Sequence, residues 1–193
     1  MSVGYLQLTG FKKPQEKPQL IRSAVIGGAL LFVWSSLSWM VLPWHHQTLK
    51  GLNEDQPVIQ AMTENTRGSG VYLVPFTNHK KKAENAPPQI TKSPFVFMVY
   101  NADGYGNMGF RMAAALLGDM MTAFFLAWVI SFFNVYGFLP RVLFAALSAL
   151  FAGLAMHVPN EIWWGHSTAF TLVAVADLVI GWTIAGLAVA KFL

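Results

Sequence analysis

Long apolar runs determine what this chain can fold into. Two of them cover residues 112–133 and 169–190, and each is about 22 residues long. At about 1.5 Å per residue, such a run in helical form crosses the hydrocarbon core of a bilayer, which is about 30 Å thick. The two runs therefore predict membrane-spanning helices.

The composition agrees with a membrane protein. Of the 193 residues, 54% are hydrophobic and only 11% are charged, whereas soluble domains carry about 25% charged residues. The absence of cysteine excludes disulfides, thiolate metal ligands and a cysteine nucleophile. The net charge of +4 comes with no Arg-rich helix or RNA-binding aromatic pattern, so we expect no nucleic-acid partner.

The predicted fold is an all-α integral membrane protein with four transmembrane helices. The first, residues 23–43, follows a basic tail of residues 1–22 and is longer than the apolar core of about 7–15 residues in a cleaved signal. Because no small-residue cleavage site follows it, we interpret it as an uncleaved signal anchor. The other helices belong to a region of residues 110–193, at about 110–135, 140–158 and 167–190.

Between the first and second helices, residues 44–109 predict a small α+β insertion outside the cytoplasm. A short amphipathic helix should follow Asn53, and β-branched and aromatic residues predict strands at 71–76 and 95–100. The basic run 79–82 and the proline pair 87–88 predict a solvated, turn-rich stretch between the strands.

Basic residues near the helix ends predict the orientation. Placing both termini in the cytoplasm puts six of them inside: Lys12, Lys13, Lys17, Arg22, Arg141 and Lys191. The loop 159–166 has no lysine or arginine and would lie outside. Trp44, Trp163 and Trp164 would then anchor the outer helix ends, and we expect a bacterial inner (plasma) membrane.

Asp119 and Asp177 each stand alone inside an apolar helix. An ionisable group in a spanning helix is expensive to keep and is by default a candidate functional site. Each aspartate belongs to a stripe of small residues spaced three or four apart, which lets helices approach closely, so we expect both carboxyls to face protein. The residues expected to pack the helices are Ala115, Ala123, Ala149, Ala152, Gly181 and Ala185.

The predicted topology puts both aspartates at nearly the same depth, about 10–12 Å below the outer boundary. Hydroxyl side chains of the other spans fall in the same layer. This candidate polar layer, which could relay protons, comprises Asp119, Asp177, Ser35, Ser36, Ser38, Ser148 and Thr122.

Above the layer, the sequence predicts an outer set of candidate metal ligands: His45, His46, His157, His166 and Glu161. Imidazole suits zinc, copper or iron. His157 and Glu161 would share a helical face only if the helix continued past Pro159, and we expect it to end there because residues before proline disfavour helical conformation. The histidines have no metal-motif spacing.

The sequence contains no G-x-S-x-G, H-E-x-x-H or Gly-rich phosphate motif, so we expect no enzyme, assign no catalytic residue and require no cofactor. It favours an accessory or scaffolding subunit of a larger membrane complex, with lipid and other membrane subunits as partners. Two alternatives stay open. One is a proton- or ion-coupled carrier that uses the Asp119/Asp177 pair, since two adjacent carboxyls cannot both ionise cheaply. The other is a metal-binding membrane protein that uses the outer histidines.

Overall fold

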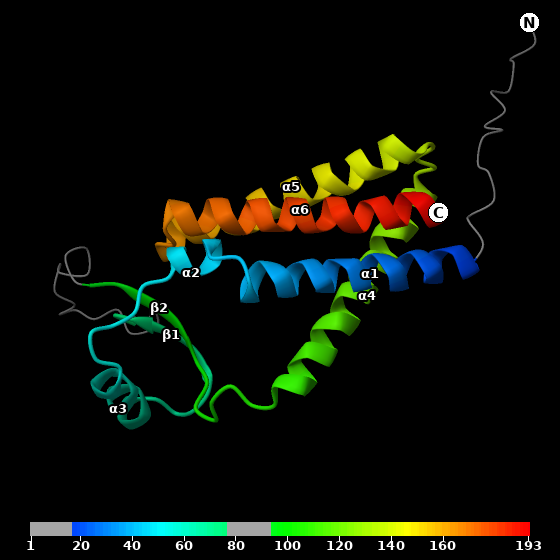
Figure 1. The fold of residues 1–193 in the computed structure, drawn as a ribbon. Coiled ribbons are helices and arrows are strands. Elements are labelled where there is room, and N and C mark those ends of the chain that lie inside the picture. The colour runs from blue at the N-terminus through cyan, green and yellow to red at the C-terminus, as the bar shows by residue number, and fades with distance from the viewer. Residues whose placement is uncertain (1–16, 77–93) are drawn as a thin grey trace, which may run out of the picture. The chain divides into compact units, whose positions relative to one another are not determined.

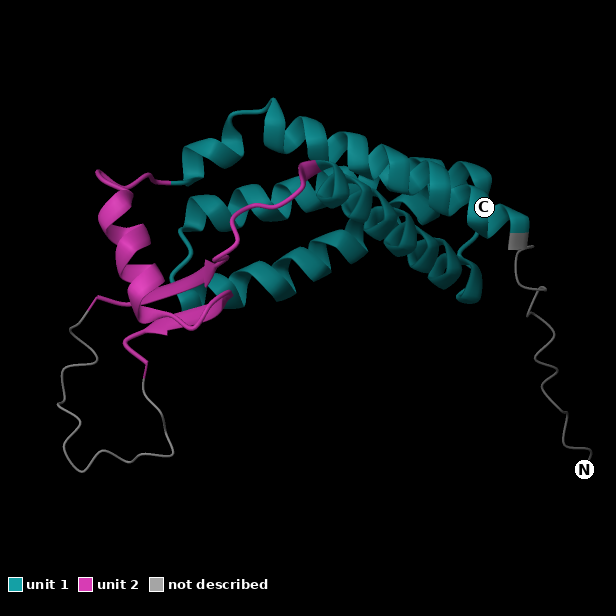
Figure 2. Ribbon diagram, turned by 90° about the horizontal axis from the view of Figure 1, so that it is seen from below, with its two compact units in different colours: residues 1–49, 109–193 teal, residues 50–108 magenta. Residues whose placement is uncertain are grey.

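The computed structural model describes residues 17–76 and 94–193, which fall into two compact units (Figure 1, Figure 2). Unit 1 combines the chain up to Leu49 with Gly109–Leu193, and unit 2 is Lys50–Met108. The basic residues Lys12 and Lys13 and the segments 79–82 and 87–88 lie outside the described residues.

The described part of unit 1 contains four helices that are long and apolar enough to cross a membrane, which confirms the predicted number of candidate spans. They are α1 (Lys17–Met40), α4 (Met108–Phe132), α5 (Phe138–Trp164) and α6 (Thr168–Phe192). A further short helix, α2 (Trp44–Thr48), follows α1 and was not predicted.

The end of α5 differs from the prediction. The helix continues through Pro159 to Trp164, because a proline inside a helix removes one backbone hydrogen bond but does not prevent the next turn from forming. Gly165 ends the helix instead, with a left-handed φ of 75° that favours glycine. Its N–H donates to the carbonyl of Glu161 at 3.2 Å.

Helix α6 is central to unit 1, and α1, α2 and α5 all pack against it. Glycines allow the close approach, as the sequence predicts for Gly181. A Cβ at Gly181 would lie 2.7 Å from the Trp34 ring on α1, and one at Gly186 would lie 2.7 Å from the Cβ of Ala145 on α5.

Helix α4 is packed at only one end. Its later half joins a buried cluster with the start of α1 and the end of α6, whereas its first half diverges from them (Figure 1). Gly28 of α1 marks the crossing, because a Cβ there would collide with the backbone of Met120. The divergence leaves Ala115 exposed, although its stripe partner Ala123 is fully buried.

The other predicted packing residues are likewise partly buried and partly exposed. Ala149, Gly181 and Ala185 are buried. Ala152 is exposed because it borders a cavity rather than a neighbouring helix.

Unit 2 contains helix α3 (Gln56–Asn65) and a two-stranded antiparallel sheet of β1 (Gly70–Val74) and β2 (Val96–Tyr100). Gly70 pairs with Tyr100 and Val74 with Val96. The predicted helix and both strands are therefore present. The helix begins at Gln56, after Asp55 rather than Asn53, and no side chain caps it.

Candidate functional site

The carboxylate of Asp177 joins three helices of unit 1. Its Oδ1 accepts a hydrogen bond of 2.7 Å from Nε1 of Trp34 on α1, and its Oδ2 lies 3.3 Å from Nε2 of His45 on α2. The His45 side chain is 2% exposed and that of Asp177 is 15% exposed. The stripe of small residues on α6 correctly predicted that this carboxyl faces protein.

Local geometry explains why Trp34 reaches Asp177. Gly181 lies one turn after Asp177 on α6, and its missing side chain leaves room for the indole ring. The same indole N–H also lies 3.2 Å from the Asp177 backbone carbonyl. The donor is therefore held against the backbone and the side chain of one residue.

His45 is enclosed by aromatic rings and a hydroxyl. Its imidazole stacks on Trp39 with ring centroids 3.8 Å apart and meets Trp44 edge to face at 5.6 Å. The Ser38 hydroxyl lies 3.1 Å from Nε2 of His45 and accepts a 2.9 Å hydrogen bond from Nε1 of Trp44. We call this group the His45 cluster: Trp34, Ser38, Trp39, Trp44, His45 and Asp177.

The cluster contains serine, histidine and aspartate but lacks the geometry of a nucleophilic triad. In a triad, the hydroxyl and the carboxylate bind opposite nitrogens of the imidazole. One nitrogen takes the proton of the hydroxyl, and the carboxylate orients the ring through the other nitrogen. Here Ser38 and Asp177 both approach Nε2 of His45. A proton from Ser38 thus has no route across the ring, and the arrangement serves to bind α2 to α1 and α6.

Asp119 has different surroundings. It lies half-buried on α4, beside the crossing of Met120 with Gly28, and it makes no hydrogen bond or ion pair with any residue that the structure describes. The hydroxyl of Thr122, one turn later, bonds the carbonyl of Gly118 in its own helix. The structure therefore gives the two aspartates separate environments, one satisfied by neighbouring helices and one unpartnered within the described residues.

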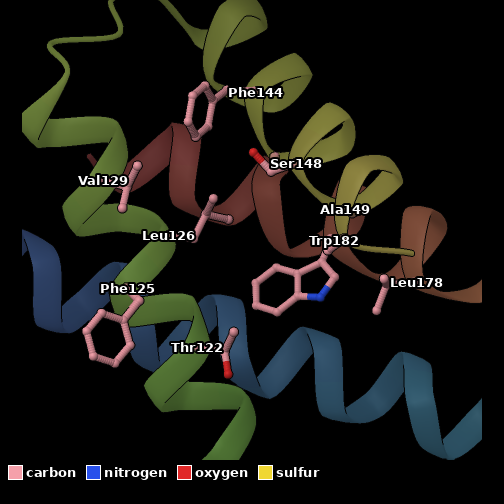
Figure 3. A pocket seen from close by; sticks show the side chains of 11 residues that line it. Thr122, Phe125, Leu126, Val129, Phe144, Ser148, Ala149, Leu178 and Trp182 are labelled. Carbon is pink, nitrogen blue, oxygen red and sulfur yellow. The ribbon is translucent and has the colours of Figure 1, made fainter. Parts of the chain in front are cut away.

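The predicted polar layer is divided between these environments and a cavity. Ser38 and Asp177 meet in the His45 cluster, whereas Ser35 and Ser36 lie half-buried on α1. Thr122 and Ser148 line a cavity of about 330 Å³ between α4, α5 and α6 (Figure 3). The rest of its wall is apolar and aromatic, and includes Leu126, Val129, Phe144, Leu178 and Trp182.

The candidate metal ligands fall into two places. His45 points into its cluster, while Nε2 of His46 lies 3.1 Å from the carbonyl of Trp39. His157, Glu161 and His166 lie where α5 meets α6, and the Glu161 carboxylate accepts a 2.6 Å bond from Thr168. Within residues 17–76 and 94–193, no group of three His, Cys, Asp or Glu side chains is arranged to hold a metal ion.

The tryptophans of α1 and α2 are the site residues that the sequence reasoning missed. Trp44 was interpreted only as a membrane-interface anchor, yet its indole donates to Ser38. Trp34 precedes Ser38 by four residues, so both lie on one face of α1. A buried indole N–H requires an acceptor. A tryptophan on an apolar helix, together with an aspartate on another apolar helix, was therefore the sequence signal that could have predicted the bond between Trp34 and Asp177.

Four helices of this length and hydropathy, with a small sheet between the first two in the chain, support a multi-pass membrane protein. Comparison of the chain with protein-family models, with curated proteins and with solved structures gives no match.

Proposed function

We propose that this protein is an accessory subunit of a larger membrane complex and that α4 binds a neighbouring subunit. The observation that carries the proposal is the unpartnered carboxyl of Asp119 among the described residues of an apolar helix. Placing an ionised aspartate at the centre of a spanning helix costs about 2.5–3.5 kcal/mol on insertion scales. A donor on another subunit would offset that cost.

Asp177 illustrates how this chain satisfies such a group, since it receives donors from two helices. Leu117 and Met121 beside Asp119 are exposed, and the crossing of α1 at Met120 supplies no donor to the Asp119 carboxyl among the described residues. A helix of a neighbouring subunit that carries lysine, arginine or an indole N–H at the same depth would supply the missing donor to Asp119. We infer contact with protein because a half-buried carboxyl facing only hydrocarbon is rare.

The proposed orientation has both termini in the cytoplasm of a bacterial cell, with residues 44–109 outside and α1 as signal anchor. Three cations support it by gathering at one end of unit 1. The Arg22 guanidinium lies 4.4 Å from the Phe192 ring centroid, Nη1 of Arg141 lies 3.4 Å from the Ala190 carbonyl, and Lys191 lies in the last turn of α6. We call the end of unit 1 that carries Arg22, Arg141 and Lys191 the Arg141 end. Lysine and arginine are enriched at the cytoplasmic ends of membrane helices.

The test is purification of the tagged protein from its native membrane in mild detergent, followed by native mass measurement. Wild type should co-purify with other membrane chains in a defined assembly. Asp119→Leu should release them without lowering the unfolding midpoint of the isolated chain. The matched control is Thr122→Val, one turn away, because its hydroxyl is already satisfied within α4. A monomeric wild-type protein with no bound chain would exclude the subunit function.

The His45 cluster favours a second candidate, proton coupling. His45 Nε2 and the Asp177 carboxylate lie 3.3 Å apart, and a buried imidazole beside a carboxylate is a pair that can exchange a proton without involving Ser38. In vesicles containing the purified protein, Asp177→Asn should then abolish pH-driven uptake of ions or solutes while Asp119→Asn retains it. If neither wild type nor variant responds to a pH gradient, coupling is rejected.

A further inference from the structure

We infer that the cavity between α4, α5 and α6 holds an acyl chain of an anionic phospholipid whose phosphate lies at Arg141. The inference is independent of Asp119 and of any protein partner. It combines three observations: the chemistry of the cavity wall, the position of the cavity along the helices, and the charge at the Arg141 end.

The wall selects hydrocarbon. Leu126, Val129, Phe144 and Leu178 are apolar, and no charged side chain lines the cavity. Water requires two to four polar partners, and one of the two hydroxyls, that of Thr122, is already bonded within its helix. A volume of about 330 Å³ is at the lower end of the range for small-molecule sites.

The cavity runs along the helices toward the Arg141 end. On α5 its lining extends from Ala152 back to Phe144, a rise of about 12 Å, which suits part of an acyl chain lying along the helix. Figure 3 shows Phe144 and Val129 toward one end of the cavity and Thr122 toward the other. Arg141 precedes Phe144 by three residues and Ala145 by four, so all three lie on the same face of α5. Arg141 therefore lies one helical turn beyond the end of the cavity that Phe144 lines.

Arg141 is positioned for a phosphate. Its Nε donates to the carbonyl of Val135 at 3.0 Å and its Nη1 to that of Ala190, which fixes the half-buried side chain and leaves further guanidinium donors. Arg22 and Lys191 both lie against the Phe192 ring nearby. Arginine binds phosphate through paired N–H donors, and basic pockets between spanning helices bind anionic headgroups. The positive charge therefore complements an anionic lipid rather than a zwitterionic one.

The experiment uses the full-length protein in micelles that contain phosphatidylglycerol or phosphatidylcholine with a photoactivatable group in the acyl chain. Wild type should be labelled on α4 and α5 cavity residues, and more strongly by phosphatidylglycerol. Ser148→Phe fills the cavity and should abolish this labelling. Arg141→Gln should reduce the preference for phosphatidylglycerol by about fivefold, the effect expected for one cation near an anionic headgroup. The matched control Leu147→Phe adds the same ring to an exposed neighbour and should change nothing.

Two results would overturn the inference. Labelling of Ser148→Phe equal to wild type would show that the cavity is not the binding site. Equal labelling of wild type by both lipids, unchanged in Arg141→Gln, would show unselective contact with bulk lipid. If Ser148→Phe is not monodisperse, Ser148→Leu, which fills less of the cavity, must still lower the labelling below that of Leu147→Phe.

Discussion

At the scale of residues, the two aspartates show that neighbouring helices decide what a charge in an apolar helix does. Asp177 is held by an indole and an imidazole, whereas Asp119 has no such partner among the described residues. The difference comes from α1, which packs along α6 but only crosses α4. One aspartate therefore belongs to the internal structure and the other to a surface.

The Trp34–Asp177 bond gives a prediction for stability. Trp34→Phe keeps an aromatic ring beside Gly181 but leaves Oδ1 of Asp177 without its indole donor. We expect the free energy of unfolding in detergent to fall by about 1–3 kcal/mol, the usual effect of leaving a partly buried charged acceptor unpaired. Trp163→Phe, at a ring that is 73% exposed, is the control and should unfold as wild type does. Equal stability of the two variants would contradict the prediction.

At the scale of elements, close helix crossings depend on a few glycines. Gly28 and Gly118 both lie inside long apolar helices, yet an added Cβ at Gly28 would strike the backbone of Met120, whereas nothing lies within 4 Å of one at Gly118. The two positions thus share helical conformation and differ in space alone. They form a matched pair for measuring what the crossing of α1 and α4 contributes.

Gly28→Ala should destabilise the protein by about 1–3 kcal/mol, because the helices must move apart to accept a methyl group. Gly118→Ala should leave stability unchanged or raise it by up to about 1 kcal/mol, since alanine favours a helix interior. Denaturant titration followed by circular dichroism would measure both. Stability of Gly28→Ala at or above that of Gly118→Ala would show that α4 does not cross α1 closely.

The sequence predicted the elements better than their contacts. The spans, α3 and both strands follow from local patterns of hydropathy and β-branched residues, which need no knowledge of neighbours. Helix α2 is five residues long and is stabilised by His45, whose partner lies more than 130 residues later in the chain. Likewise, Pro159 disfavours helical conformation locally, yet α5 continues past it to Trp164. The end of this helix depends on the turn at Gly165 that joins α5 to α6, and not on Pro159 alone. Partners distant in sequence leave no periodic signal.

At the scale of the whole molecule, the proposed orientation can be tested with single cysteines, because the chain has none of its own. Lys50→Cys follows α2, and Leu139→Cys lies at the start of α5, where it is exposed. In intact bacterial cells, a membrane-impermeant maleimide should label Lys50→Cys, and Leu139→Cys should react only after permeabilisation. The reverse pattern would invert the topology. Labelling of both in intact cells would show that α4, the candidate span between the two positions, does not separate them.

The central place of α6 has a consequence for biosynthesis. The ribosome makes α1, α2 and α5 before the helix that all three contact. Until α6 has been synthesised, the Trp34 indole and the His45 ring have no Asp177 carboxylate to bind. The Trp34 indole and the His45 ring therefore stay without this partner while well over a hundred residues are added. We therefore expect the His45 cluster to form late, only after α6 has joined α1 and α2.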